Sequence, residues 1–508
     1  MNLFRRKSIL ELQAEAEKDQ RLHRALGPLH LTLLGIGAII GTGIFVLTGT
    51  VAAQNAGPAV VLSFVLAGLA SVFAALCYSE FASLVPMSGS AYTYGYATLG
   101  EFFAWVIGWD LVLEYAVGAI TVAVGWSGYA VSFLNDLTGF LHQHGIPLNL
   151  TVPPVLSAAR GTVVALADGT TVTALFNLPA VIIIFLVTVL LVVGIRESAH
   201  FNNAIVFVKL AVILLFLFGA LAAVNPANWQ PFIPANTGLR EHFGWSGVVA
   251  GAGVVFFAYI GFDAVSTAAQ EAKNPQRDMP IGIIGSLLIC TFLYIVVSAV
   301  ATGVVPYKDL DVPDPIALAA DRAGMGWMAS LIKLGAIAGL SSVILVMLYG
   351  QSRVFFAMSR DGLLPPFMHQ VHPRFRTPWI ISIVTGLVVA FFAAVFTVRE
   401  AGSLCSIGTL LAFVIVSVGI MVLRVRHPEL KPAFRTPAVW VVAPLGALSA
   451  LYLMSALPLR TWLRLVIWLV IGLVIYFSYG IRRSHLANRA TAPSPQTPLP
   501  GSGSGGTG

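Results

Sequence analysis

Long apolar runs, separated by short polar stretches, follow one another along almost the whole chain. A helix needs about 20 apolar residues to cross a bilayer, and lipid offers no water to an irregular backbone. Each run of about 18 residues or more is therefore expected to form one membrane-spanning helix. Twelve such runs are present, at about 30–50, 59–85, 102–133, 178–195, 202–224, 247–269, 281–303, 328–358, 377–398, 403–424, 437–457 and 461–481. The pattern predicts an all-α polytopic membrane protein.

Positive charge is distributed unevenly over the polar stretches. If all twelve runs span the membrane, 19 Lys and Arg residues fall on the side of the N-terminus and 7 on the opposite side. Lys and Arg collect in the cytoplasmic loops of membrane proteins. We therefore expect a multi-pass protein of the cell membrane (plasma or inner) with both termini in the cytoplasm. The long polar stretch 135–177 is then an external loop.

The two ends of the chain differ from its apolar centre. Residues 1–29 are charged and mixed, and we expect a cytoplasmic N-terminal segment that forms an amphipathic surface helix or docks a small accessory membrane protein. Residues 425–483 hold the last two spans. Residues 484–508 are rich in Ser, Pro and Gly, which predicts a disordered tail.

Composition narrows the classes of function. Only 10% of the residues are charged, against about 25% in soluble domains. The net charge of +7 comes from loops between spans, so no nucleic-acid partner is expected. The three cysteines lie in apolar runs and are interpreted as core residues. The ten histidines show no metal-binding spacing, so the sequence predicts no enzyme, metal or cofactor.

The first apolar run contains a cluster of glycines at positions 35, 37, 41 and 43, ending in Gly41-Thr42-Gly43. Glycine costs roughly 0.5–1 kcal/mol against alanine inside a helix, so the cluster predicts a break in this span. A break exposes backbone N–H and C=O groups at membrane depth, which is tolerated only where they are buried in protein or line a polar cavity. The alternative is that these small residues only let helices pack closely.

A second glycine-bearing run, 251–263, lies in the sixth span at a position that corresponds to the glycine cluster of the first span. Two interrupted helices in corresponding positions indicate an inverted repeat with its binding site between the breaks, near the midplane. The two repeats are expected at 30–224 and 225–424.

Few ionisable residues lie inside the spans. Lys209 is at the centre of its span, where a charge costs at least about 2.5–3.5 kcal/mol. Its position therefore indicates a partner inside the bundle. The acidic candidates for proton transfer or substrate contact are Glu114, Glu80, Asp110 and Asp263; a structural carboxylate is the alternative for each.

Four stretches resemble the amino acid–polyamine–organocation superfamily, and within it the cationic amino acid transporter subfamily with its bacterial relatives. They are 35–45, 78–109, 257–280 and 352–365. The resemblance covers about residues 25–482. It implies the LeuT-type fold, a 5+5 inverted repeat followed by two extra helices. It also implies transport of amino acids by alternating access.

The free amides at the start of the second half of the first span, near Thr42 and Gly43, suit a substrate carboxylate. By resemblance, the carbonyls of Ile39, Phe257 and Ile260 accept the ammonium, and the Phe257 ring covers the bound side chain. Met347 borders that side chain, which favours small neutral amino acids; plain core packing is the alternative.

The resemblance also implies that the Lys209 ammonium occupies the place of a sodium ion. The partners that it implies are the carbonyls of Gly37, Ile40 and Ala338 and the hydroxyls of Ser341 and Ser342. Lysine exchanges a proton readily when its surroundings change. The sequence thus predicts proton-coupled import of alanine-like amino acids, with Glu114 as the leading acidic candidate. An exchanger, a cationic amino acid carrier and a non-transporting amino acid sensor remain alternatives.

Overall fold

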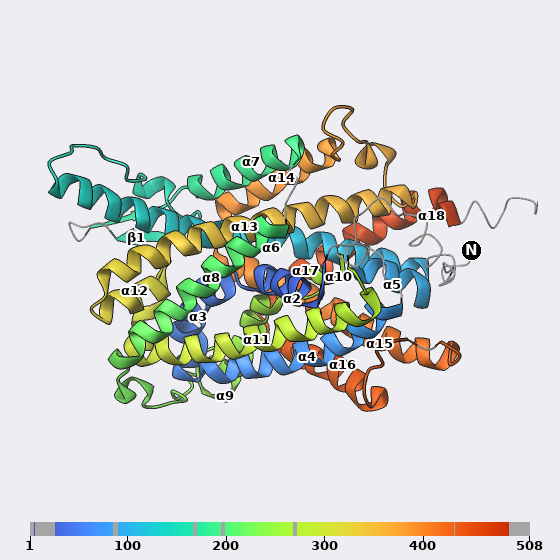
Figure 1. Cartoon of the computed structure of the whole chain (residues 1–508), viewed down its shortest axis with the longest axis horizontal. Helices are drawn as coiled ribbons and strands as arrows, with labels where there is room; N and C mark the ends of the chain where they lie inside the picture. The colour runs from blue at the N-terminus through green and yellow to red at the C-terminus, as the bar shows by residue number, and fades with distance from the viewer. Residues whose placement is uncertain are drawn as a thin grey trace, which may run out of the picture.

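Helices make up nearly all of the computed structural model, and most of the long ones run along its longest axis (Figure 1). The structure describes residue 5 and residues 26–84, 90–165, 170–194, 199–267, 272–430 and 432–486. The helices of the first half are α2 (Pro28–Ile39), α3 (Thr48–Val51), α4 (Val60–Leu84), α5 (Ser90–Thr98), α6 (Glu101–Gln143), α7 (Leu178–Val193) and α8 (Ala199–Ala220). Those of the second half are α9 (Gly244–Val255), α10 (Ala264–Thr267), α11 (Pro275–Val304), α12 (Pro315–Arg322), α13 (Gly326–Arg360), α14 (Trp379–Val395) and α15 (Val398–Arg426). The last are α16 (Val439–Ser455), α17 (Leu459–Ile475) and α18 (Ile481–Arg483).

Seven helical stretches within the described residues are long and apolar enough to cross a membrane, and five shorter apolar helices accompany them. Helix α8 exposes Phe207, Leu214 and Phe218, and α17 exposes Val466 and Val470. Exposed apolar surface of this extent is typical of helices that face lipid. The prediction of a mostly helical chain with membrane-spanning stretches agrees with this arrangement.

Two features depart from the expected elements. Helix α6 continues to Gln143, ten residues beyond the apolar run that ends at 133. Helix α6 continues through polar residues because the first glycine with a left-handed conformation, which commonly ends a helix, is Gly145. The loop that follows contains an antiparallel hairpin of β1 (Val163–Ala165) and β2 (Thr171–Thr173), so the described chain is not purely α-helical.

Helix packing encloses α2 at the centre of the molecule. Helix α6 packs along α13 and α15, and α11 packs along α4 and α2, while α8 and α13 also contact α2. Figure 1 shows α2 near the middle of the bundle. The N-terminal segment lies outside the described residues apart from positions 5 and 26–29, and the tail does so beyond 486.

Candidate substrate and ion site

The first span is broken where the glycines predicted it. Helix α2 ends at Ile39, and Ile40 has extended backbone angles (φ −71°, ψ 98°). The chain becomes helical again at Thr42 and passes into η1 (Gly43–Leu47), a π-helical segment. The first N–H groups of a helix have no acceptor within it, so the amides of this second half are available to a ligand.

The sixth span is broken as well. Helix α9 passes into η7 (Phe256–Tyr259), a 3₁₀ turn, and Ile260 is extended with ψ 134°. Gly261 follows with φ +120°, a conformation that L side chains rarely adopt. A Cβ at Gly261 would also lie 2.9 Å from the carbonyl carbon of Ala38. Glycine is therefore required here both by backbone conformation and by the close approach of α2.

The two breaks contact each other directly. A Cβ at Gly43 would overlap the backbone of Ala258. The hydroxyl of Tyr294, on α11, lies 2.8 Å from the Ile39 carbonyl oxygen and 2.7 Å from the Ala258 carbonyl oxygen. Tyr294 thus joins the carbonyls that the two breaks expose. Sequence reasoning missed it, because one tyrosine in an apolar run gives no distinctive signal.

The residues expected to hold the substrate backbone surround this junction. Thr42 is fully buried, and its hydroxyl has no hydrogen-bond partner among the described residues. The carbonyl of Phe257 accepts the N–H of Ile260 at 3.1 Å, and that of Ile39 shares the single hydroxyl proton of Tyr294 with the Ala258 carbonyl. Two of the three carbonyls expected to bind an ammonium therefore already have a donor. The Thr42 hydroxyl and the neighbouring amides remain available.

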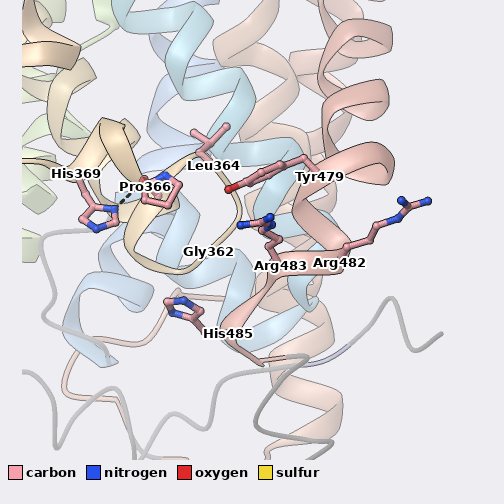
Figure 2. Close-up of a pocket in the computed structure, with 9 residues that line it drawn as sticks. Gly362, Leu364, Pro366, His369, Tyr479, Arg482, Arg483 and His485 are labelled. Carbon is pink, nitrogen blue, oxygen red and sulfur yellow. Dashed lines mark hydrogen bonds between the residues drawn. The ribbon is translucent and has the colours of Figure 1, made fainter.

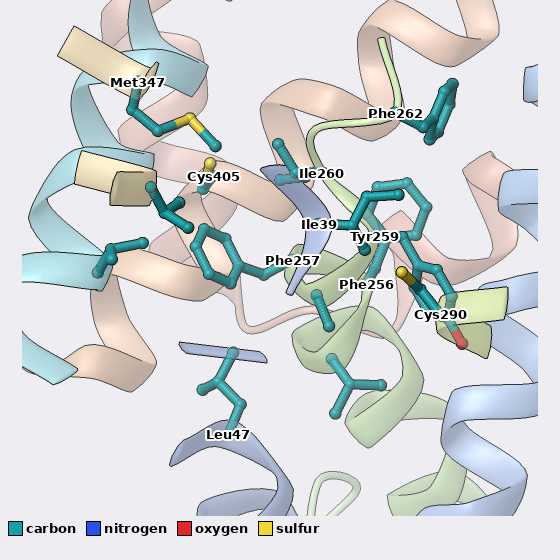
Figure 3. Packing of buried hydrophobic residues seen from close by; sticks show 14 of the residues in the cluster. Ile39, Leu47, Phe256, Phe257, Tyr259, Ile260, Phe262, Cys290, Met347 and Cys405 are labelled. Atoms are coloured by element: carbon teal, nitrogen blue, oxygen red, sulfur yellow. The ribbon is translucent and has the colours of Figure 1, made fainter. Parts of the chain in front are cut away.

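The residues expected to border the substrate side chain lie on one side of the junction. Figure 3 shows that Phe257 points to the side of Met347 and Cys405, whereas Tyr259 and Phe262 point away from it. Phe257 and Met347 are both buried. A Cβ at Gly118 would lie 3.3 Å from the Met347 sulfur, so this methionine fills space against α6. Cys405 was not singled out from the sequence.

Lys209 is fully buried and binds the first break. Its Nζ donates to the carbonyl oxygens of Gly37 at 2.7 Å and Ile40 at 3.1 Å. Its aliphatic stem passes Gly339 on α13, where a Cβ would lie 2.9 Å from Cε. The ammonium therefore connects α8 to the last turn of α2.

Three other partners expected for Lys209 are not hydrogen-bonded to it in the described structure: Ala338, Ser341 and Ser342. The Ser341 hydroxyl donates to the Ile337 carbonyl at 2.8 Å and accepts from Trp126 Nε1 at 2.9 Å. The Ser342 hydroxyl donates to the Gly339 carbonyl at 2.8 Å. Serine hydroxyls within a helix commonly satisfy the carbonyl of the preceding turn, and this local bond takes precedence here.

The acidic candidates divide into two groups. Glu114 and Asp110 lie one turn apart on α6, and both are buried. Glu114 Oε1 and both carboxylate oxygens of Asp110 have no hydrogen-bond partner among the described residues. Asp263 accepts the N–H of Gly261 at 3.3 Å, at the second break. These carboxyl groups remain candidates for polar contacts along the pathway.

Glu80 instead has a structural role. Its carboxylate receives two hydrogen bonds from Arg424, at 2.8 and 2.9 Å, and one from the N–H of Thr436 at 2.8 Å. A carboxylate that receives three donors in this way is fully engaged in holding α4 to α15.

Two broken helices joined at mid-bundle, with the buried Lys209 of α8 bound to carbonyls of the first, match the resemblance in the sequence. A family model described as "Amino acid permease" matches residues 26–478. The chain belongs to the amino acid permease family. The superfamily resemblance is therefore confirmed, and the protein is a multi-pass membrane protein of a transporter family and not an enzyme.

The permease is similar to curated proteins over most of its length. It is 49% identical to the branched-chain amino acid permease BcaP of Bacillus subtilis over 96% of this chain and 99% of the relative. It is 48% identical to the methylthioribose transporter of the same organism, with the same coverage. It is 38% identical to the vacuolar cationic amino acid transporter 2 of Arabidopsis thaliana, over 85% of this chain and 64% of the relative.

Proposed function

We propose that this permease imports small neutral L-amino acids together with protons, by alternating access. The observation that carries the proposal is the buried Lys209 ammonium on the carbonyls of Gly37 and Ile40, at the end of a broken helix. A charge buried inside a membrane span is costly, and a lysine at such a position therefore supports a role in the transport cycle. Protonated Lys209 holds α8 to α2, and loss of the proton removes that attraction.

The broken helices supply the amino acid site of this proposal. The amides near Thr42 and the positive end of the helix dipole suit a carboxylate. Ile260 supplies a carbonyl for the ammonium. The Phe257 ring and Met347 give the side-chain space an apolar lining, which favours aliphatic over charged substrates.

The architecture that we propose follows from the same breaks. Residues 30–224 and 225–424 form two inverted five-helix repeats of the LeuT type, and 425–483 add two helices, giving twelve spans. The excess of Lys and Arg on one side supports a cytoplasmic location of both termini in a cell-membrane protein. The substrate site then lies between the repeats, and rocking of one against the other opens it to either side.

Uptake into proteoliposomes tests this function. Labelled alanine is expected to accumulate when the outside is acidic, with no sodium present. The panel includes leucine, arginine and methylthioribose, because relatives are named for branched-chain and cationic amino acids and for methylthioribose. Accumulation driven by a sodium gradient alone would refute proton coupling. Binding of alanine without flux would indicate a sensor. Uptake that occurs only when the proteoliposomes contain amino acid inside would indicate an exchanger.

A further inference from the structure

A cavity of about 400 Å³ opens where the last helices end. One wall is the end of α13 with the loop after it, and the other is the end of the last membrane helix (Figure 2). The lining residues of the first wall are Ser359, Gly362, Leu364, Pro366 and His369; those of the second are Tyr479, Arg482, Arg483 and His485. Figure 1 shows α18 at one end of the molecule, whereas α2 with its break lies near the middle. The cavity is thus separate from the substrate site.

The lining of this pocket is basic. Arg482, Arg483 and His485 come from the chain end, and His369 comes from η10 (Pro366–His369) on the other wall. None of the described lining residues is acidic. Within the described part of the chain, no carboxylate forms a salt bridge with Arg482 or Arg483. The Arg483 guanidinium stacks over the Tyr479 ring, 5.5 Å from its centre, which holds it in the pocket wall.

The backbone holds this basic segment in place. Gly362 has φ +81°, and a Cβ there would collide with the Arg483 carbonyl. The N–H of His485 donates to the Asp361 carbonyl at 3.1 Å. The chain end is thus fastened over the end of α13.

Hydrogen bonds also fix the opposite wall. The buried Ser359 hydroxyl donates to the Pro365 carbonyl at 2.7 Å, and it lies 2.8 Å from His369 Nδ1. Because the serine proton is used on Pro365, the histidine Nδ1–H is the donor to Ser359. Both walls of the pocket are therefore built before any ligand arrives.

The pocket lies at the boundary of the apolar surface. Ile471 and Val474 of α17 and Phe477 of η11 (Tyr476–Gly480) are exposed, as lipid-facing residues are. Arg482 and Arg483 follow within two helical turns. At a rise of about 1.5 Å per residue, the guanidinium groups lie at the depth of the lipid headgroups.

We propose that this pocket binds the phosphate group of an anionic phospholipid, whose acyl chains lie along the exposed face of α17 and η11. Arginine binds phosphate oxygens with two parallel N–H donors, and basic pockets between membrane helices bind anionic headgroups. A free phosphate ion shares this headgroup chemistry but gains nothing from the apolar face. A choline headgroup finds no acidic partner in the described lining.

Native mass spectrometry of the full-length protein in detergent tests the site independently of transport. The ligand is dioctanoyl phosphatidylglycerol, with dioctanoyl phosphatidylcholine and inorganic phosphate as comparisons. The R482Q/R483Q variant is expected to bind phosphatidylglycerol roughly 25-fold more weakly, from about fivefold per arginine. R482K/R483K keeps the charge and is expected to stay within about threefold. R426Q, an exposed arginine at the end of α15, is the matched control and should bind like the native protein.

Equal binding of both lipids, or unchanged phosphatidylglycerol affinity in R482Q/R483Q, would overturn the proposal. If inorganic phosphate displaced phosphatidylglycerol completely at an equal concentration, the ligand would be a phosphate ion and not a lipid. If the double variant does not elute as a monodisperse species, R483Q alone replaces it. Its expected loss is about fivefold, and unchanged affinity in this variant would equally refute the site.

Discussion

At the residue scale, the Tyr294 hydroxyl lies between two carbonyl oxygens that belong to different broken helices. It is 2.8 Å from the oxygen of Ile39 and 2.7 Å from that of Ala258. Unwound backbone in an apolar interior needs such partners, because a buried carbonyl without a donor costs about 1–3 kcal/mol. Tyr294 therefore stabilises the junction of the two breaks.

Tyr294→Phe removes this donor and keeps the ring. We expect it to destabilise the protein by about 1–3 kcal/mol, seen as a lower midpoint of thermal unfolding, and to slow alanine uptake. Tyr452→Phe, at a tyrosine whose exposed fraction is 52%, is the matched control and should change neither quantity. Native stability and uptake in Tyr294→Phe would show that the hydroxyl does not hold the breaks together.

Met347 sets the space for the substrate side chain in our account. Met347→Ala removes several methylene equivalents beside Phe257, and each is worth about 0.8 kcal/mol of apolar contact. We expect the uptake ratio of leucine to alanine to rise by about fivefold or more. The measurement is competition of each amino acid against labelled alanine. Met328→Ala, at a buried methionine nearer the start of the same helix, is the control. An unchanged ratio in Met347→Ala would favour plain core packing.

Single residues also show what the sequence can predict. Lys209 was singled out because a lysine at the centre of an apolar run has few acceptable positions, whereas its contacts with the Gly37 and Ile40 carbonyls were implied by the family resemblance. The Ser341 hydroxyl bonds within its own helix turn and not to Lys209, which the position of the serine in the sequence does not reveal. Tyr294 was missed because its partners depend on how distant helices pack. The sequence alone did not decide whether Glu80 takes part in proton transfer or substrate contact, or is a structural carboxylate. Its hydrogen bond to Arg424, 344 positions away, indicates the structural role.

At the element scale, the two glycines of the first break have different surroundings. A Cβ at Gly43 would overlap the Ala258 backbone, whereas a Cβ at Gly41 would lie 3.6 Å from Val343, an ordinary contact. The sequence predicts the break from the glycines but not which of them touches the other helix. That distinction depends on the relative placement of η1 and η7.

This difference gives a matched pair of variants. Gly43→Ala forces the two breaks apart, so we expect loss of alanine uptake and a lower midpoint of thermal unfolding. Gly41→Ala keeps the backbone N–H and meets only side-chain atoms, so uptake should stay within about threefold. Both are measured in the same proteoliposomes. Equal behaviour of the pair would contradict the contact between the breaks.

The ends of two helices differ from the ends of the apolar runs that predicted them. Helix α15 begins at Val398, earlier than the apolar run at 403, because Thr397 and Glu400 form a reciprocal capping box. Helix α6 extends past its apolar run for lack of a stop signal. Hydropathy locates the part of a helix that lies in lipid, whereas caps and left-handed glycines decide where the helix ends.

At the scale of the whole molecule, polar contacts close the side that we assign to the exterior. Gln54, in η2 (Ala52–Ala56), donates to Asp311 at 2.8 Å and accepts from Arg399. Arg399 also lies 3.6 Å from the Glu241 carboxylate, and Asn55 donates to the Glu241 carbonyl at 2.7 Å. These contacts join the second half of the first span to α15 and to two loops. We call them the outer clasp.

Arg399→Ala removes two contacts of the outer clasp. Partly exposed pairs contribute up to about 1 kcal/mol each, so local opening should become more frequent, by up to about 30-fold for the two contacts together. Hydrogen–deuterium exchange is expected to accelerate at 52–56 and around 241, and Arg322→Ala, at an exposed arginine outside the clasp, should leave it unchanged. Unaltered exchange in Arg399→Ala would show that the clasp does not hold this side closed.

The proposed function depends on proton movement through Lys209, and a pH-sensitive dye trapped inside proteoliposomes reports that movement. Addition of external alanine should acidify the interior with the native protein. Lys209→Met carries no proton, so it should give no acidification, while Lys308→Met, at an exposed lysine, should behave as the native protein does. Accumulation of labelled alanine without acidification, or acidification that persists in Lys209→Met, would contradict the account.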